Sequence, residues 1–173
     1  MTVTRATAPD RVELPPFQAL LDAHGRDVHR LLVATVGRGD AEDCYQEAWL
    51  AALRAYPRLR DASNLRSWIL TIAHNKALDH IRSARRRAVP VAELPELAAP
   101  GRPGVAHPAS SEGELWDRVR ALPDKQRTAV ALRFIGDLTH AEIARIMDTS
   151  EAAARRSVHE AIKQLRQEHP HED

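Results

Sequence analysis

Apolar residues recur along the chain at the three-to-four spacing of amphipathic α-helices, beginning near Phe17. The first such segment stops at the two glycines of "GRGD", which favour the end of a helix. A second segment follows, and Asp40 is a candidate N-cap for it. It runs to about Tyr56, because Pro57 disfavours α conformation in the residue before it. The pattern therefore predicts two consecutive helices.

A third helical segment reads "LRSWILTIAHNKALDHIRSARRR", and Ser63 or Asn64 can cap its start. Prolines and glycines then become frequent in the stretch "AVPVAELPELAAPGRPGVAHPASSEG", a composition typical of a linker without stable helix. The chain is therefore predicted to divide into a first unit at residues 14–88, a flexible linker at 89–112 and a second unit at 113–168.

The second unit is also predicted to be helical. Apolar positions from Leu115 to Leu122 fit a short helix, and Pro123 can open the next one, "DKQRTAVALRFIG". Thr139 and Glu142 have the spacing of a capping box at the start of "THAEIARIM", after which "DTS" turns the chain into a last helix. This succession of helix, short turn and helix is the arrangement of a helix-turn-helix motif.

Composition supports the same fold class. Glycine and aromatic residues are few, whereas Ala, Leu, Arg and Glu are abundant and favour helices over sheets. We therefore expect an all-α protein built from two small helical domains. Its net charge of +1 is close to zero, so only the distribution of charge along the chain can indicate partners.

Cysteine usage and hydropathy indicate the compartment. A single cysteine, Cys44, excludes an internal disulfide and a multi-cysteine zinc site, and it fits a reducing cytosol. No apolar segment approaches the length needed to span a membrane, and "MTVTRATAPDRVELPP" lacks the apolar centre of a signal peptide. We expect a cytoplasmic protein without membrane insertion.

The second predicted helix separates into an apolar and an acidic side on a helical wheel. The apolar side consists of Ala41, Cys44, Tyr45, Ala48, Trp49 and Ala52. The acidic side consists of Asp40, Asp43 and Glu47, with Gln46 at its border. A solvated polar face is the commoner explanation of such a cluster, and the cluster alone does not establish a binding surface.

The third predicted helix is strongly basic. Only Asp79 opposes its basic residues, which are Arg66, Lys76, Arg82, Arg85, Arg86 and Arg87. Phosphate binding is the usual role of such a concentration of charge. Trp68, on the same helix, is more often a core residue in this setting, although it could also stack on an unpaired base.

The last predicted helix has a basic arc beside an apolar one. The basic arc holds Arg155, Arg156, His159, Lys163 and Arg166, and the apolar arc holds Ala154, Val158, Ala161, Ile162 and Leu165. In a helix-turn-helix motif only the first turns of this helix reach base edges. The candidates for reading the DNA sequence are therefore Glu151, Ala152, Arg155, Arg156 and His159. Lys163 and Arg166 lie nearer phosphates. An ordinary surface helix with a basic stripe is the alternative.

Candidate catalytic groups are missing from the pattern. The chain has nine histidines, but His24 and His29 are five apart and His74 and His80 are six apart, so neither pair shares a helical face with a carboxylate. No Walker-type loop and no GxSxG motif occurs. We therefore expect no metal, no cofactor and no enzymatic activity.

In their order and spacing, these segments resemble a bacterial RNA polymerase sigma factor of the extracytoplasmic-function (ECF) group of the sigma-70 family. The resemblance covers about Leu14 to Gln167. "DAEDCYQEAWLAALRAY" is similar to region 2.2 of the family, and "LRSWILTIAHNKALDHIRSARRR" is similar to regions 2.3 and 2.4. "LPDKQRTAVALRFIGDLTHAEIARIMDTSEAAARRSVHEAIKQLR" is similar to region 4.

The resemblance implies a protein that binds core RNA polymerase and promoter DNA and opens the promoter without nucleotide hydrolysis. The residues implied to dock on the clamp-helix coiled coil of the largest polymerase subunit are Asp43, Gln46 and Glu47. Those implied to recognise and open the minus-ten element are Asn64, Arg66, Trp68, Asn75, Lys76, Arg82, Arg85 and Arg86. Those implied to read the minus-thirty-five element are Glu151, Ala152, Arg155, Arg156, His159 and Lys163. An inhibitory anti-sigma factor, common in the group, is a further candidate partner.

The helix-turn-helix segment departs from the usual family pattern. Asp148 and Thr149 stand where glycine and isoleucine are frequent, and Ala154 stands where valine is usual. Aspartate accepts the left-handed conformation at a lower cost than most residues, so we expect the turn to form. Because the segment departs from the family pattern, promoter preference is not transferred from a relative.

Two other hypotheses are open at this point. A stand-alone helix-turn-helix regulator would bind operator DNA as a dimer, through paired half-sites, without joining polymerase. A helical metal-dependent hydrolase would need ligands that the pattern lacks. The acidic cluster and the basic third helix favour the sigma factor.

Overall fold

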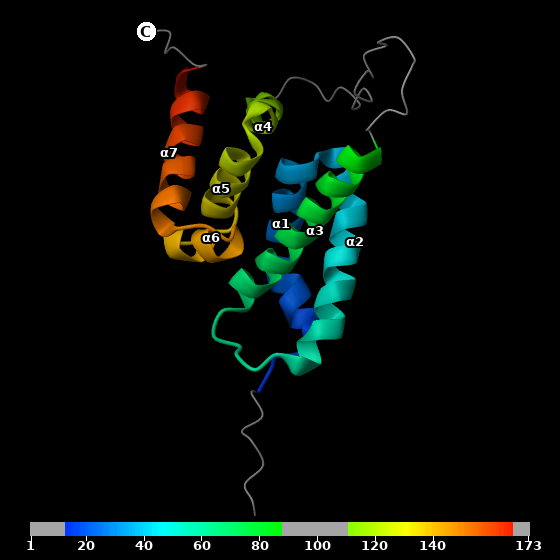
Figure 1. Cartoon of the computed structure of the whole chain (residues 1–173). Helices are drawn as coiled ribbons and strands as arrows, with labels where there is room; N and C mark the ends of the chain where they lie inside the picture. Colours follow the sequence, from blue (N-terminus) through cyan, green and yellow to red (C-terminus); the bar gives the residue numbers. More distant parts are fainter. Residues whose placement is uncertain (1–12, 88–110, 168–173) are drawn as a thin grey trace, which may run out of the picture.

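The computed structural model describes residues 13–87 and 111–167, and within these ranges it contains only helices and their connections. The first unit comprises α1 (Phe17–Val36), α2 (Arg38–Ala55), the 3₁₀ helix η1 (Tyr56–Arg58) and α3 (Leu65–Arg87). The second unit comprises α4 (Ser111–Ala121), α5 (Asp124–Phe134), α6 (His140–Ile146) and α7 (Glu151–Gln167) (Figure 1). The all-α prediction is confirmed.

Two sequence predictions fall largely outside these ranges. Most of the linker predicted at 89–112 lies outside the described residues, and its last two positions belong to the start of α4. Most of the N-terminal segment "MTVTRATAPDRVELPP", which is predicted not to be a signal peptide, lies outside them as well. Both remain predictions.

A single glycine joins α1 to α2. Gly37 has a φ of 85°, in the left-handed region that glycine adopts at little cost. Its N–H donates to Val33 O and its carbonyl accepts from Ala41 N, both at 3.1 Å. The prediction that Asp40 caps α2 is wrong, because α2 begins at Arg38 and no side chain caps it. Asp40 lies in the first turn, where a carboxylate still interacts favourably with the helix dipole.

Asn64, one of the two predicted candidates, caps α3. Ser67 N donates to Asn64 Oδ1 at 2.9 Å, and Trp68 N donates to Asn64 O at 3.1 Å. The side of α3 that packs in the core consists of Ile69, Leu70, Ala73, His74 and Ala77. Small residues on this side allow close approach of the helices, and the histidine is the exception that the apolar pattern did not predict.

The predicted capping box starts α6. Thr139 N donates to Glu142 Oε2 at 2.8 Å, and Glu142 N donates to Thr139 Oγ1 at 3.3 Å. The bond from the Thr139 backbone is the largest cause that lowers the pKa of Glu142. Pro123 precedes α5 as its N-cap residue, immediately before the helix rather than in its first turn.

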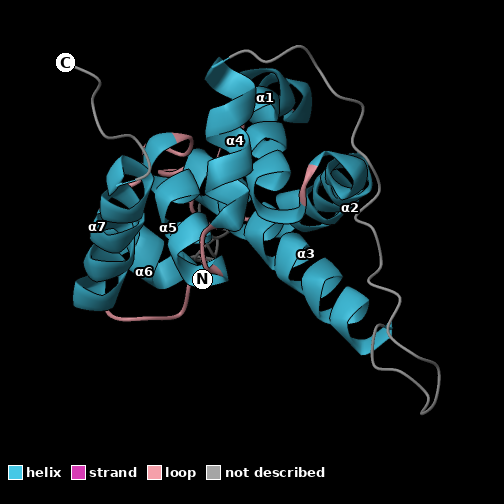
Figure 2. Ribbon diagram, turned by 90° about the horizontal axis from the view of Figure 1, so that it is seen from above, coloured by secondary structure: helices cyan, strands magenta, loops and turns pink. Residues whose placement is uncertain are grey.

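The two units pack against each other along α1. Helix α1 contacts α2 and α3 within its own unit and α4 and α5 in the second unit, while α3 also contacts α6 (Figures 1 and 2). Most buried apolar residues of both units form one contiguous cluster, and Leu122, Val130 and Ala161 of the second unit form a smaller separate one. A Cβ added at Gly136, in the turn after α5, would lie 3.0 Å from Leu70 Cδ1. This turn therefore lies directly against α3.

The buried histidine of α3 makes stability depend on pH. His74 is 4% exposed, and its Nδ1 has no hydrogen-bond partner. Burial, and secondly the charge of Arg82, lower the pKa of His74 from 6.5 to about 4. Between these two values the unfolded chain binds a proton that the folded protein does not bind. Stability is therefore full above about pH 6.5 and is lost as the pH falls toward 4.

We expect the free energy of unfolding to fall by about 2 kcal/mol between pH 7 and pH 5 through this residue alone. The measurement is urea unfolding at both pH values for the parent protein and for His74→Leu. The leucine variant should lose much of the difference, whereas a control, His29→Leu at an exposed position of α1, should keep it. Equal pH dependence in the parent and His74→Leu would contradict the assignment.

Candidate polymerase and DNA interfaces

Helix α2 carries the predicted acidic surface, here called the acidic ridge, which consists of Asp40, Asp43 and Glu47 with Gln46 at its border. All four residues are exposed. The opposite side of the helix buries Ala41, Cys44, Ala48, Trp49 and Ala52. Helical periodicity therefore predicted the two sides of α2 correctly, with Tyr45 half-buried at their boundary.

Cys44 lies directly behind the acidic ridge. Burial raises the pKa of its thiol to about 11, and the charges of Glu47, Asp40 and Asp43 act in the same direction. The thiolate is the reactive form of cysteine, so the Cys44 side chain is unreactive at neutral pH. Cys44 is a packing residue of the first unit.

The acidic ridge meets the basic helix α3 along one edge. Glu47 Oε2 lies 3.8 Å from Lys76 Nζ, and Asp40 Oδ2 lies 3.3 Å from His80 Nε2. Lys76 and Glu47 were predicted for different partners, DNA and polymerase, yet they are neighbours. His80 is a residue of this boundary that sequence analysis did not single out, because its pairing with α2 has no local signal.

The C-terminal half of α3 presents its basic residues to solvent. Arg82, Arg85 and Arg86 are exposed, and so is Asn75, about two turns before Arg82. Within the helix, Arg82 Nη1 lies 3.9 Å from Asp79 Oδ1. Such an exposed pair is worth less than about 1 kcal/mol, so it leaves the arginine available to a phosphate. This part of the predicted minus-ten surface is continuous along one helix.

The N-terminal residues predicted for the minus-ten element have different surroundings. Arg66 is half-buried, and its Nη2 lies 2.9 Å from Asp27 Oδ2 of α1. Asn64, which caps α3, also donates through Nδ2 to Glu142 of α6. Polar residues of other helices therefore already contact both side chains. No pattern in the sequence pairs them with Asp27 or Glu142.

Trp68 is half-buried at the start of α3. Its ring lies 5.9 Å, centroid to centroid, from that of Tyr56, and the two planes are inclined by 44°. Tyr56 is itself fixed, because its hydroxyl donates to Pro15 O at 2.7 Å. The indole is thus partly covered by core residues.

The turn between α6 and α7 forms with aspartate in the left-handed conformation, as predicted. Asp148 has a φ of 49°. Thr149 N donates to Ala144 O at 2.9 Å and Asp148 N donates to Arg145 O at 3.4 Å, the two bonds of a Schellman motif. The Ser150 hydroxyl then accepts from Ala153 N at 3.2 Å and starts α7.

Replacing Asp148 with glycine should stabilise the second unit. A non-glycine residue in the left-handed region destabilises the fold by about 1–2 kcal/mol, and by less when it is aspartate. Glycine removes this cost, but it also makes the unfolded chain more flexible, which offsets part of the gain. We expect Asp148→Gly to raise the free energy of unfolding by about 0.5 kcal/mol and Asp148→Ala to lower it. Urea unfolding measures both. If the glycine variant were no more stable than the alanine variant, the left-handed conformation at residue 148 would not be strained.

Helix α7 divides as the helical wheel predicted. Ala154, Val158 and Ala161 are buried, and Ile162 and Leu165 are half-buried. The candidate DNA-contacting residues are all exposed: Glu151, Ala152, Arg155, Arg156, His159, Lys163 and Arg166. Arg155 Nη2 donates to Glu151 Oε1 at 2.9 Å across one turn. Two candidate base-reading residues are thus paired with each other in the free protein.

Residues 13–87 and 111–167 contain no group of three or more His, Cys, Asp or Glu side chains placed to hold a metal ion. Among the helices of the same ranges, none is long and apolar enough to cross a membrane.

Comparison with known proteins identifies the family. The Sigma-70 region 2 model matches residues 20–87, and the Sigma-70, region 4 model matches residues 112–165. The ECF RNA polymerase sigma factor SigD of Mycobacterium tuberculosis is 34% identical over 145 residues, which are 80% of this chain and 68% of that protein. The chain belongs to the ECF group of the sigma-70 family.

A second relative extends the comparison. The ECF RNA polymerase sigma factor BldN of Streptomyces coelicolor is 32% identical over 159 residues, which are 88% of this chain and 60% of BldN. The chain therefore spans less than two thirds of the length of BldN. Matches to both family regions in one chain do not favour a stand-alone helix-turn-helix regulator.

Two solved structures share the fold. The sigma factor RpoE from Bartonella quintana, solved with the anti-sigma factor NepR, superimposes with a TM-score of 0.72 at 19% identity, covering 87% of this chain and 94% of RpoE. CnrH, solved with the cytosolic domain of CnrY, gives a TM-score of 0.62 at 19% identity, covering 86% of this chain and 84% of CnrH.

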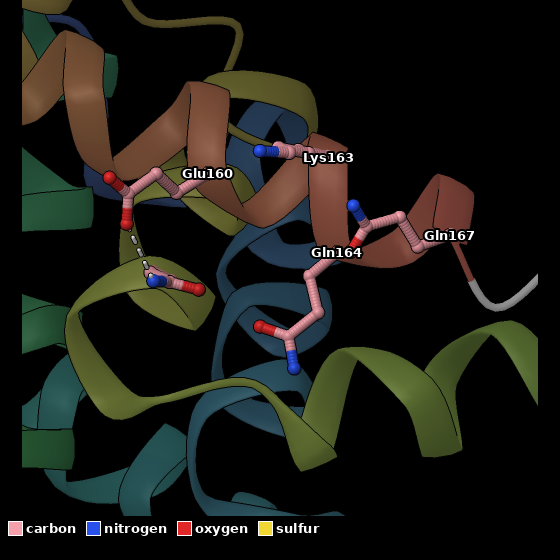
Figure 3. A pocket seen from close by; sticks show the side chains of 5 residues that line it. Glu160, Lys163, Gln164 and Gln167 are labelled. Carbon is pink, nitrogen blue, oxygen red and sulfur yellow. Dashed lines mark hydrogen bonds between the residues drawn. The ribbon is translucent and has the colours of Figure 1, made fainter.

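Two of the open grooves beside α7 in the second unit of this sigma factor differ in chemistry. Figure 3 shows Glu160, Lys163, Gln164 and Gln167 around a polar groove of about 500 Å³, where Gln126 Nε2 donates to Glu160 Oε2 at 3.2 Å. The other groove, of about 690 Å³, is apolar and is lined by residues of α4, α5 and α7 that include Trp116 and Phe134. Sequence analysis predicted neither groove, because the walls of the polar groove come from α5 and α7 and those of the apolar groove come from α4, α5 and α7.

Proposed function

We propose that this sigma factor binds core RNA polymerase through the acidic ridge, opens the minus-ten element with α3 and reads the minus-thirty-five element with α7. The observation that most supports this division is the separation of three exposed surfaces of different chemistry. The acidic ridge, the basic half of α3 and the basic arc of α7 lie on different helices. A dimeric regulator would need only the last of them.

Polymerase docking is assigned to Asp43, Gln46 and Glu47. These side chains are exposed, and the opposite side of α2 is packed in the core. The helix that carries them is therefore already ordered before polymerase binds. Acidic residues that face a basic partner helix increase the rate of encounter and fix the register more than they add affinity. This suits a subunit that binds polymerase, starts transcription and leaves.

Minus-ten opening is assigned to both halves of α3. Asn64, Arg66 and Trp68, near the start of α3, would hold an unstacked base, which offsets part of the few kcal/mol needed to unpair it. Farther along, the exposed Asn75, Arg82, Arg85 and Arg86 and the half-buried Lys76 would contact the phosphate backbone and adjacent bases. Strand opening is then driven by binding, and the chain acts without a catalytic residue or cofactor.

Minus-thirty-five reading is assigned to the first turns of α7. Glu151, Ala152, Arg155, Arg156 and His159 would reach base edges in the major groove, and Lys163 would contact phosphate. We place the functional boundaries at 14–88 for region 2, 89–112 for the linker and 113–168 for region 4, and we propose the cytoplasm as the compartment.

A regulatory protein is a further proposed partner. The structures of RpoE and CnrH were solved with NepR, an anti-sigma factor, and with the cytosolic domain of CnrY. We propose that an anti-sigma factor also controls this chain. Affinity purification of the chain from its source bacterium should then recover a protein that blocks binding to core polymerase.

The decisive experiment is a pull-down of core RNA polymerase with the purified chain, followed by transcription from genomic DNA and mapping of RNA 5′ ends. We expect stoichiometric binding and starts that share two upstream sequence elements. Core polymerase alone is the matched control. Failure to bind core combined with retained binding of duplex DNA would support the stand-alone regulator instead.

A further inference from the structure

The edge of α3 that faces α2 carries a row of basic residues, here called the inner row, which consists of Lys76, His80 and Arg87. Lys76 and His80 lie about one turn apart, and the exposed Arg87 follows about two turns after His80. Helical periodicity places Arg82 and Arg86 on a neighbouring side of the helix. The start of α2 lies beside this part of α3 (Figure 1). The basic surface of α3 is therefore wider than the residues assigned so far to the minus-ten element.

Two carboxylates of α2 pair with the first two members of the inner row. His80 Nε2 lies 3.3 Å from Asp40 Oδ2, and Lys76 Nζ lies 3.8 Å from Glu47 Oε2. The side chains of Asp40 and Glu47 are 56% and 66% exposed, whereas those of His80 and Lys76 are 26% and 32% exposed. In each pair a partly buried nitrogen group thus contacts an acidic group that lies mostly in solvent.

The pair with Asp40 shows that His80 has a place for an anion. An imidazole N–H donates to an anionic oxygen, and the ring adds a positive charge when it is protonated. A pair as exposed as this one contributes little to stability, so another anion can replace the carboxylate. A DNA phosphate has an advantage in this exchange, because its neutralisation releases counterions from the duplex. A phosphate can therefore displace Asp40 from His80.

We propose that His80 is a further minus-ten contact, whose Nε2 binds a promoter phosphate in the place that Asp40 occupies in the free chain. This inference rests on the proposed role of α3 in promoter binding. Asp40 is not among the residues assigned to polymerase, and its side chain turns into solvent when DNA binds. Asp40 thus competes with the promoter for His80, and removing its charge strengthens promoter binding through His80.

A pair that only joins α2 to α3 would behave differently. Such a pair would change the free energy of unfolding, but it would not change how DNA affinity depends on salt. The salt dependence reports the number of phosphates that cationic side chains neutralise. It therefore distinguishes a phosphate contact at His80 from a contact that merely holds two helices together.

The first test compares holoenzymes formed with the variants His80→Arg and His80→Gln. Arginine keeps a cation at this position, whereas glutamine keeps a polar side chain without charge. Fluorescence anisotropy measures the affinity for a labelled promoter fragment over a range of salt concentrations. The slope of log affinity against log salt should be steeper for the arginine variant by about 0.7–0.9, the value for one phosphate contact. The matched control compares His29→Arg with His29→Gln, at an exposed position of α1, and should give equal slopes.

The second test is a double-mutant cycle between Asp40 and His80, read as promoter affinity of the holoenzyme at fixed salt. Asp40→Asn removes the competing charge and nearly keeps the shape of the side chain. In the parent background it should tighten promoter binding about threefold, in line with the weakness of an exposed pair. In the His80→Gln background it should have no effect. Urea unfolding of each variant checks that the first unit stays folded.

Equal salt slopes for the two His80 variants would overturn the phosphate contact. Equal tightening by Asp40→Asn in both backgrounds would overturn the exchange, because Asp40 would then repel DNA without acting through His80. If the inference about His80 alone is wrong, every variant still binds core polymerase and starts transcription at the same promoter. If the sigma assignment is wrong, the parent chain itself forms no holoenzyme, and the inference falls with it.

Discussion

Charge reversal of the acidic ridge, Asp43→Lys combined with Glu47→Lys, is expected to abolish binding of core RNA polymerase while the protein stays folded. Both side chains are exposed, so the variant buries no new charge. The one described ion pair that it removes, Glu47 with Lys76 at 3.8 Å, is worth less than about 1 kcal/mol. Against a basic partner helix, like charges cost several kcal/mol, which corresponds to a loss of about 100-fold or more in affinity.

The measurement is titration of labelled chain with core polymerase, together with circular dichroism and urea unfolding of the variant. A matched control reverses two exposed acids of the same unit that lie off α2, Glu13→Lys with Asp22→Lys. The control should bind core within about threefold of the parent, since its charges lie off the proposed interface. Undiminished binding by the ridge variant would remove Asp43 and Glu47 from the polymerase interface.

The distribution of residues within each helix could be predicted because a helix repeats every 3.6 residues. The apolar side of α2, the basic arc of α7 and the capping box at Thr139 follow from local spacing, and the structure confirms all three. Asp148 is a further example, because the left-handed preference of aspartate is a property of the residue itself. The α2 cap was mispredicted because Gly37 joins two helices without any intervening loop.

Contacts between helices could not be predicted in this way. The partners of Arg66 and Arg85 lie 39 residues away in Asp27 and Asp124, and that of Asn64 lies 78 residues away in Glu142. A basic residue in a phosphate-binding pattern has the same local signature whether or not an acid from another helix covers it. The availability of a candidate site therefore depends on tertiary packing, which only the structure describes.

The same limit applies at the boundary between α2 and α3. Sequence analysis assigned Glu47 to polymerase and Lys76 to DNA as though their helices were independent, but the two side chains lie 3.8 Å apart. Docking of Glu47 on polymerase would release Lys76 for DNA. If Glu47 docks on polymerase as proposed, polymerase binding and the release of Lys76 are coupled at this boundary.

The second large effect is expected on α7. Arg155→Ala combined with Arg156→Ala should abolish recognition of the upstream promoter element by the holoenzyme. Each base-edge contact contributes about 1–3 kcal/mol of discrimination, so losing both lowers specific affinity by about 100-fold. In the free chain Arg155 is paired with Glu151 at 2.9 Å, but an exposed pair of this kind costs less than about 1 kcal/mol to break.

Footprinting of holoenzyme on a promoter found by 5′-end mapping measures this loss, and permanganate reactivity reports strand opening at the minus-ten element. A matched control removes two exposed basic residues outside the proposed sites, Arg58→Ala with Lys125→Ala. The control loses the same number of positive charges, so it lowers the affinity for DNA only through the salt-dependent attraction between basic residues and phosphates. If both variants protect the upstream element as the parent does, Arg155 and Arg156 do not read it. If protection is lost only in the α7 variant while core binding persists, base reading by the first turns of α7 is established separately from polymerase docking.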